Sequence, residues 1–378
     1  MSGADTLTVE PAVTTRDLEQ YIRFPFELYR EYPHWVPPLL AERRDFLNPR
    51  KNPVYEYAEI QPFLARRGAR VVGTITALKN ARFSQFHAAG GGIGFFGLYE
   101  CERNPETSRA LFNAAAQWLG ARGISIMRGP TNFTTNDVLG LLVDGFHDDP
   151  AIMMPYNPPY YAEQFDAYGL SRAKDLFALE VTATECAGRL DELANKLLAR
   201  GRIVVRQIAL RHWHDELEFL RRCYNEAWAD NWGFVPWTDR ELEAIAKELR
   251  PLIDPRLAFV GEIDGQQAAI SIAVPDANEA LKLARGRLLP LGLARILWRV
   301  KVTGCRRMRV LALGVLPQHR RLGLDAVLIQ RTIRNGILLG YERAEVGWIL
   351  EDNDAMLKSL RHINAQRTKV YRVFDKSL

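Results

Sequence analysis

Cysteine is scarce in this sequence, with four residues in 378 and no CxxC pair among them. Such spacing provides neither a disulfide framework nor the ligand set of a structural zinc, so we expect reduced thiols and no metal. Long apolar runs are missing as well, and the N-terminal segment lacks the charged-then-apolar pattern of a secretion signal. We therefore expect a cytoplasmic protein with no membrane partner.

No stretch of the chain is strongly basic. The formal net charge is +5, and lysines and arginines are spread along the sequence apart from short pairs such as Arg320-Arg321. A nucleic-acid-binding protein gathers its positive charge on one face, so we expect no nucleic-acid partner. A modest positive balance does suit a small ligand that carries phosphate groups. The GxSxG motif of nucleophilic hydrolases is missing too.

The sequence does contain an internal repeat and enough apolar residues, 47%, for two folded domains. One constant offset superposes Gly97 on Gly314 and Arg103 on Arg320. The same offset brings together two Asn-Asp pairs, each thirteen residues after a glycine. A duplicated domain is the simplest source of such a repeat.

Strands and helices alternate in both halves, which predicts an α/β or α+β sheet with helices on its faces. We place the domains at 1–184 and 185–378. In the second half we expect strands near 203–209, 257–263, 267–274, 307–315, 342–349 and 367–374, and helices near 213–229, 238–249, 322–338 and 353–363. In the first half we expect helices near 15–31, 106–121 and 158–167.

The segment 310–328, VLALGVLPQHRRLGLDAVL, is the most informative part of the chain. An apolar strand leads into a basic turn with a glycine, and the turn opens directly into a helix. The unpaired N–H groups and the positive dipole end of a helix N-terminus bind pyrophosphate. Gly323 would let the phosphate approach the backbone, and Arg320 and Arg321 would add positive charge beside it.

The same segment resembles the signature of the GNAT superfamily of acyltransferases, which is a strand, V-x-P and then R/Q-x-x-G-x-G/A at a helix start. Val315, Pro317, Arg320 and Gly323 stand at the matching positions. Asp325 stands where the family usually has glycine or alanine. An aspartate there repels a pyrophosphate unless its side chain turns away.

A second part of the family pattern follows the next strand, where members carry an asparagine at a helix start beside the pantetheine arm. Asn353 stands there, but Leu360 replaces the tyrosine that often protonates the departing thiolate. The resemblance implies acetyl-CoA or another acyl-CoA as cofactor, and an amine of a small molecule or peptide as substrate. The residues it predicts to bind the cofactor are Val315, Arg320, Arg321, Leu322, Gly323, Leu324, Asp325, Ala326 and Asn353.

Chemistry of this kind needs no covalent enzyme intermediate. It needs an amine held against the thioester, backbone N–H groups that polarise the carbonyl, and a base or water that takes the proton. Glu345 and Glu351 lie on or just after the penultimate expected strand, and they are the candidate catalytic bases.

The segments WVPPL, IGFFGLYE, RGPTNFTTND, IMMPYNPPYY and RRLGLDA extend the resemblance over 20–375, to a group of bacterial proteins with two tandem GNAT-like domains. The group implies that each domain is a mixed, mostly antiparallel twisted sheet flanked by helices. In the N-terminal copy the repeat offset puts Glu106 at the glycine of the loop, where a carboxylate repels phosphate. We therefore expect only the C-terminal copy to bind CoA.

Three groups of side chains are candidates for acceptor binding, and each has a structural alternative. The polar residues that follow an apolar strand also suit a tight turn and a helix cap instead of acceptor binding. The tyrosines among prolines also suit an interdomain seam, and the aromatic residues at helical spacing also suit a core. These candidates are Asn132, Thr134 and Asn136; Tyr156 and Tyr160; and Tyr224, Trp228 and Trp232.

Three functions remain open at this point. The first is an acyl-CoA-dependent N-acyltransferase. The second is a binding or scaffold protein whose two copies have both lost catalysis, which Leu360 and Asp325 favour. The third is transfer from aminoacyl-tRNA, as in tandem-GNAT Fem-type ligases, which would require a basic channel.

Overall fold

The computed structural model describes residues 6–87, 92–182, 188–288 and 291–378. The chain forms two compact units. Unit 1 consists of Met1–Leu176, Leu281–Ala294 and Lys369–Leu378, and unit 2 of Phe177–Ala280 and Arg295–Thr368. The division thus falls at Leu176, a few residues before the expected boundary, and the last ten residues belong to unit 1.

Unit 1 is built on a mixed sheet in which the strands follow the order β1-β2-β3-β4-β5-β13, with β6 also paired to β13. β4 pairs with β5 in parallel, whereas the pairs β1–β2, β2–β3, β3–β4, β5–β13 and β6–β13 are antiparallel. Its strands are β1 Leu7–Pro11, β2 Ala58–Arg67, β3 Arg70–Asn80, β4 Ile93–Cys101, β5 Ile126–Gly129, β6 Leu141–Asp144, the start of β7 Ser171–Thr182, and most of β13 Gln366–Ser377. Its helices include α1 Thr15–Leu28, α2 Leu40–Phe46, α3 Ala81–Phe86, α4 Pro105–Gly120 and α5 Tyr161–Tyr168.

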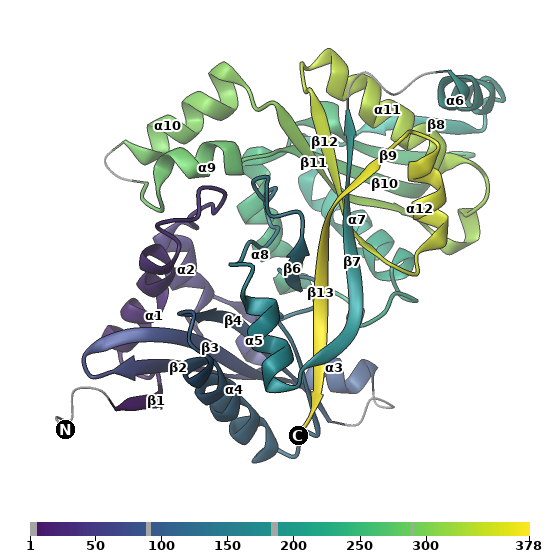
Figure 1. Ribbon diagram of the computed structural model, residues 1–378. Coiled ribbons are helices and arrows are strands. Elements are labelled where there is room, and N and C mark those ends of the chain that lie inside the picture. Colours follow the sequence, from purple (N-terminus) through teal and green to yellow (C-terminus); the bar gives the residue numbers. More distant parts are fainter. Residues whose placement is uncertain (1–5, 88–91, 183–187, 289–290) are drawn as a thin grey trace. The chain divides into compact units, whose positions relative to one another are not determined.

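Helix α4 lies along the sheet of unit 1 (Figure 1) and begins with strong local signals. The side chain of Asn104 accepts hydrogen bonds from the N–H groups of Glu106 and Thr107, and Pro105 occupies the first turn. Both features favour a helix start. The buried face of α4 packs into the main apolar core of unit 1, through Leu111, Phe112, Ala115 and Leu119.

In unit 2 the strands of the mixed sheet follow the order β7-β12-β11-β10-β9-β8. Its strands are β8 Ile203–Gln207, β9 Ala258–Ile263, β10 Gln266–Pro275, β11 Arg307–Val315 and β12 Arg343–Leu350, with the end of β7. Its helices include α6 Arg189–Ala199, α7 Trp213–Ala227, α8 Asp239–Leu249, α11 Leu324–Leu338 and α12 Asp354–Arg361. Helices α9 Asn278–Ala284 and α10 Gly292–Trp298 each contribute residues to both units.

Helix α11 forms a core with the sheet of unit 2 and with α6. Leu324, Val327 and Leu328 are completely buried against Ala194 of α6 and Phe259 of β9. Because these apolar positions recur with helical spacing, the helix can rest one face on the strands. The start of α11 is therefore held rigidly at the end of β11.

These features confirm the predicted fold class, an α/β fold with mixed sheet flanked by helices in each unit. Across the described residues, no helix combines the length and the apolar character that a bilayer crossing requires. The cysteines Cys101, Cys223 and Cys305 are buried free thiols, and Cys186 lies outside the described residues.

Candidate functional site

The turn between β11 and α11 leaves the helix N-terminus open. Gly323 is the residue that precedes α11, with φ of 81°, and in the described part of the chain no side chain caps this end. The first helical hydrogen bond is donated by Val327 to the carbonyl of Gly323, so the N–H groups of Leu324, Asp325 and Ala326 have no helical partner. Together they form a positive end that is suited to an anion.

Glycine is required at position 323 for two reasons. Its φ lies in the left-handed region, and a Cβ there would press against the side chain of Leu197 of α6. Arg321 is also in the left-handed region, with φ of 67°, and its side chain is exposed beside the turn. Arg320 is exposed as well, and its Nη2 donates to the carbonyl of Ala227 at 2.8 Å. The turn therefore presents two guanidinium groups near the helix end.

The other predicted cofactor residues of this turn differ in exposure. Leu322 is exposed, Asp325 and Ala326 are half-buried, and the side chain of Leu324 is buried in the core of unit 2. Val315 is half-buried and pairs with β10. Leu324 can therefore contact a ligand only through its backbone, not through its side chain.

The corresponding helix of unit 1 is closed. Asn104 precedes α4 as Gly323 precedes α11, and its side chain occupies the first N–H groups. Glu106 is the second residue of its helix, as Asp325 is of α11. The prediction that Glu106 replaces the loop glycine is therefore wrong, because the turn of unit 1 is shorter and places Asn104 there. The two helices therefore differ in the residue before their first turn, which is Asn104 in α4 and Gly323 in α11. Both have an acidic residue at their second position.

Strands β11 and β12 pair in parallel only at their beginning. The pairing runs from Arg307–Arg343 to Val310–Val346, whereas β11 continues to Val315. Directly after Val310 the register with β10 shifts, which leaves Leu311 as a bulge. A bulge bends its strand and increases the local twist. The edge of β11 that faces β12 is thus left unpaired between the bulge and the turn before α11.

In unit 1 the matching position is filled by the chain itself. The parallel pairing of β4 with β5 ends at Phe95–Arg128, and Thr131 then donates its N–H to the carbonyl of Phe96. The side chain of Asn132 accepts the N–H of Leu98 at 3.1 Å. Asn132, one of the predicted acceptor residues, therefore occupies the strand edge that a ligand would use.

The neighbouring predicted residues form a local turn. Asn136 donates its N–H to Oγ1 of Thr134 at 3.3 Å, and Asp137 donates its N–H to the carbonyl of the same threonine. This arrangement matches the structural alternative of a tight turn.

The aromatic residues of α7 pack against the sheet of unit 2. The ring of Trp228 lies so close to Gly314 of β11 that a Cβ on the glycine would overlap it. Tyr224 stacks on Trp228 with ring centroids 4.8 Å apart and on Trp237 at 3.8 Å. Trp232 is half-buried in the segment that follows α7. Trp228 thus lies beside β11 near the open edge, while Tyr224 lies between two other rings.

The two candidate bases have different environments. Glu345 is completely buried on β12, 4.0 Å from the guanidinium of Arg307. Glu351 is half-buried and follows the end of β12. Because a proton acceptor has to reach the substrate, this placement favours Glu351 and makes Glu345 part of an internal charge cluster.

Helix α12 places the other two residues of the family pattern. Asn353 caps the helix, and its side-chain oxygen accepts the N–H of Met356 at 3.2 Å. Leu360 is 2% exposed and packs against Ile329 and Ile349 in an apolar cluster. Position 360 is therefore a core position in this protein.

We expect Leu360→Tyr to lower the free energy of unfolding by about 1 to 3 kcal/mol, because a filled cluster has no room for the larger ring. Turnover should not rise. Leu360→Met, which keeps the volume, should cost less than about 1.5 kcal/mol. Urea unfolding of both variants measures the difference, and a stable tyrosine variant with faster turnover would show that the position faces the reaction instead.

A carboxylate among tyrosines forms a second polar cluster, in unit 1. Glu100 lies on β4, and its Oε2 accepts hydrogen bonds from the hydroxyl groups of Tyr29 and Tyr161, each at 2.8 Å. Burial raises the pKa of Glu100 to about 7, although both hydrogen bonds oppose the shift. The predicted Tyr160 donates to the carbonyl of Cys101 at 2.6 Å.

Sequence reasoning found Tyr156 and Tyr160 but missed Glu100, Tyr29 and Tyr161. The carbonyl of Tyr156 accepts from the hydroxyl of Tyr29 at 3.3 Å, so both predicted tyrosines do lie at this cluster. The available signal was the single acidic residue near the end of the apolar segment IGFFGLYE.

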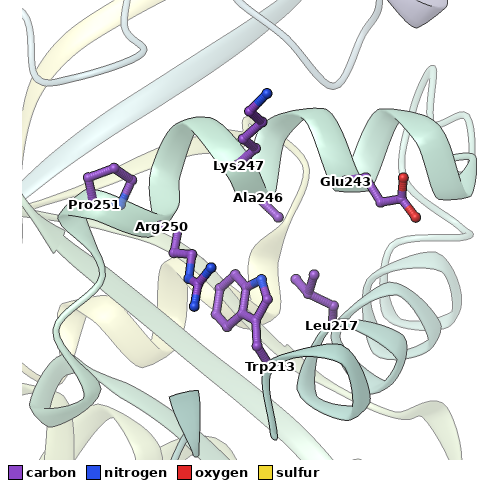
Figure 2. Close-up of a pocket in the computed structure, with 7 residues that line it drawn as sticks. All are labelled: Trp213, Leu217, Glu243, Ala246, Lys247, Arg250 and Pro251. Atoms are coloured by element: carbon purple, nitrogen blue, oxygen red, sulfur yellow. The ribbon is translucent and has the colours of Figure 1, made fainter. Parts of the chain in front are cut away.

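A separate hollow of about 590 Å³ lies between α7 and α8 and contains none of the predicted site residues. Figure 2 shows the ring of Trp213 and the guanidinium of Arg250 side by side, 5.7 Å from guanidinium carbon to ring centroid. The hollow is also lined by Leu217, Glu243, Ala246, Lys247 and Pro251.

Known proteins share both the sequence and the fold of this chain, although no family model matches it. The chain is 37% identical to a protein of Caulobacter vibrioides named bacterial ceramide synthase, over 98% of both chains. It is 33% identical to protein YghO of Escherichia coli, over 98% of this chain and 95% of the relative.

Among solved structures, a tandem GNAT protein from the clavulanic acid biosynthesis pathway matches with a TM-score of 0.56 and 14% identity, over 98% of both chains. A GCN5-related N-acetyltransferase from Sphaerobacter thermophilus matches with a TM-score of 0.54 and 11% identity, over 98% of this chain and 95% of that one. These likenesses show the tandem GNAT fold. The chain therefore belongs to the family of GNAT-fold N-acyltransferases that includes the bacterial ceramide synthase of Caulobacter vibrioides.

Proposed function

We propose that this protein transfers a long acyl chain from acyl-CoA to the amino group of a long-chain amine, so that the product is an amide of the ceramide type. The observation that carries the proposal is the uncapped N-terminus of α11 beside the unpaired edge of β11. The relative named bacterial ceramide synthase supports the class of acceptor, since a ceramide is an N-acylated long-chain amino alcohol.

The residues of unit 2 fit an acyl-CoA. The N–H groups of Leu324, Asp325 and Ala326 point from the helix start, and the side chains of Arg320 and Arg321 are exposed beside it. This set suits the pyrophosphate, because helix N-termini bind anions and arginine adds charge and donors. The unpaired edge of β11 suits the amide groups of the pantetheine arm, which can pair with it as an added strand would.

Bound in this way, an acyl-CoA supplies a thioester whose carbonyl carbon is attacked by the amine and whose thiolate leaves. The contribution of the chain is to orient the two groups and to polarise the carbonyl through backbone N–H groups near the bulge at Leu311. The amine nitrogen loses one proton as the amide forms. Glu351, half-buried after β12, is the acceptor that this geometry favours for that proton.

Calorimetry with CoA tests the binding half of the proposal. We expect the wild-type protein to bind CoA, and Arg321→Glu to weaken the affinity at least thirtyfold, equal to about 2 kcal/mol, because the new charge repels the pyrophosphate. Lys247→Glu is the matched control, since Lys247 is also an exposed cation of unit 2 but lies on α8. The absence of any heat from the wild type at millimolar CoA would overturn the proposal.

Turnover tests the chemical half. The protein is mixed with a long-chain amine and with either acetyl-CoA or palmitoyl-CoA, and free thiol and amide are measured. We propose that palmitoyl-CoA is the better donor. A preference for acetyl-CoA would instead favour an N-acetyltransferase, as the resemblance to the GNAT superfamily implies.

A binding or scaffold protein is the second candidate. It is favoured by the burial of Glu345 and Leu360, because one of the two candidate bases and the position of the family's usual tyrosine then lie inside the core. Binding of CoA without amide formation from any tested amine would support it.

A further inference from the structure

The cluster at Glu100 has an oxygen that the protein does not use. Oε2 of Glu100 accepts the two tyrosine hydroxyls, whereas Oε1 has no hydrogen bond within the described residues. Glu100 as a residue is half-buried, and its Oε1 is not completely enclosed by the protein. Solvent therefore reaches Oε1, and the carboxylate presents one free acceptor to a ligand.

No cation of the described chain forms an ion pair with this carboxylate. Arg43 is the positive group that acts on Glu100, from a distance, and it pairs with Glu42 at 3.7 Å. Burial disfavours the charged form of the carboxyl group and raises the pKa of Glu100 to about 7. A cationic ligand would supply the missing charge.

Aromatic rings surround the carboxylate from several elements. Tyr29 of α1 stacks on Trp35 with ring centroids 4.7 Å apart, and it lies 6.5 Å from Tyr156. On the other side, Tyr160 and Tyr161 meet edge to face at 5.2 Å. Aromatic faces attract cations and also pack against alkyl chains, so this lining suits an ammonium group on an apolar stem.

The carboxylate is placed by a distortion of its strand. The register of β4 with β3 shifts between Gly97 and Glu100, and Leu98 has a positive φ of 45°. The carbonyl of Leu98 accepts hydrogen bonds from the hydroxyl groups of Tyr21 and Thr74, at 3.1 and 3.2 Å. These bonds fix the bulge and therefore the direction of Glu100.

We propose that unit 1 holds an ammonium-binding site of its own, in which Oε1 of Glu100 accepts a hydrogen bond from a primary ammonium group and the rings of Tyr29, Trp35 and Tyr156 line the start of its alkyl chain. The site provides the head-group pocket for the long-chain amine. This identification of the ligand as the acceptor rests on the proposed function, whereas the site itself does not.

The affinity for an ammonium should depend on pH through Glu100. The groups that face it are Tyr29, Tyr161, Tyr160, Tyr21, Cys101 and Arg43. Burial raises the pKa of each of these tyrosines and of the Cys101 thiol, the latter to about 12, so they stay neutral near pH 7. Glu100 alone among them changes charge there, and its ionised form is the better acceptor.

The experiment is calorimetric titration of the full chain with octylamine at pH 8, with octan-1-ol as the uncharged probe. We expect the wild type to bind octylamine, and Glu100→Gln to bind it at least tenfold more weakly while its affinity for octan-1-ol is unchanged. Glu163→Gln is the matched control, because Glu163 lies on α5 near Tyr161 but is exposed. Affinity of the wild type should fall severalfold from pH 8 to pH 6, and that of Glu100→Gln should not.

Equal binding of octylamine by the wild type and Glu100→Gln, or equal binding of octylamine and octan-1-ol by the wild type, would overturn the site. A parallel titration with CoA separates the two proposals, because an intact CoA affinity with no amine binding contradicts only this one. If Glu100→Gln unfolds, Tyr29→Phe replaces it, because this variant removes one of the two hydroxyl groups that donate to Oε2. We expect Tyr29→Phe to bind octylamine more weakly and octan-1-ol as the wild type does. Unchanged binding of octylamine would count against the site.

Discussion

Replacing Arg307 by alanine is expected to lower the free energy of unfolding of unit 2 by about 3 to 5 kcal/mol. Arg307 is 2% exposed, and its Nε and Nη2 each lie 2.6 Å from Oδ2 of Asp276, which is completely buried. Glu345 lies 4.0 Å from the same guanidinium. Removal of the arginine takes a buried positive charge away from both carboxyl groups, and breaking a buried ion pair by removing one partner is strongly destabilising.

Arg202→Ala is the control for this prediction. Arg202 and Asp264 also form a close pair in unit 2, with a shortest distance of 2.6 Å, but their side chains are 64% and 54% exposed. An exposed pair contributes little to stability, because water and salt screen the attraction. Urea unfolding of the two variants measures both costs, and a similar small loss in both would mean that water reaches the cluster around Arg307.

Glu100→Gln is expected to remove a large pH dependence of stability from unit 1. The pKa of Glu100 is raised from its ordinary 4.5 to about 7 by burial, so the folded state binds the proton more tightly than the unfolded state. The stabilising contribution of the protonated form is complete below pH 4.5 and is lost as the pH rises through 7. Between pH 5 and pH 8 the wild type should lose about 2 to 3 kcal/mol relative to the variant.

Urea unfolding of the wild type and of Glu100→Gln at several pH values tests this sign and size. The variant resembles the protonated form, so the two proteins should be similar at pH 5 and the variant should be the more stable at pH 8. Glu163→Gln, exposed on α5, should follow the wild type at every pH. Parallel pH profiles for the wild type and Glu100→Gln would contradict the raised pKa.

The sequence was most informative where a candidate site consists of the backbone of one short segment. Gly323, Arg320 and Arg321 were recognised because a strand, a glycine turn and a helix follow one another within nineteen residues, and local spacing is all that such a turn requires. The same reasoning misjudged Glu106, because the repeat offset assumed turns of equal length. The helix starts show instead that Asn104 stands opposite Gly323.

The sequence was least informative where a candidate site combines residues from distant segments. Glu100, Tyr29 and Tyr161 come from β4, α1 and α5, and only the folded chain brings a carboxylate and two hydroxyls within 2.8 Å. The burial of a side chain likewise cannot be predicted from its position along the sequence. Glu345 lies near the start of β12 and Glu351 directly after its end, yet only the first is enclosed with Arg307.

By itself, then, the sequence determined the two-domain α/β fold, the repeat and the open turn before α11, since each depends on periodicity or on neighbours along the chain. Only the tertiary structure decided that the last ten residues belong to unit 1, that Asn132 fills the strand edge of that unit, and that Glu100 holds an unused oxygen. The physical reason is that strand pairing, burial and pKa depend on which residues from distant segments become neighbours. Local patterns in one sequence do not predict these long-range contacts.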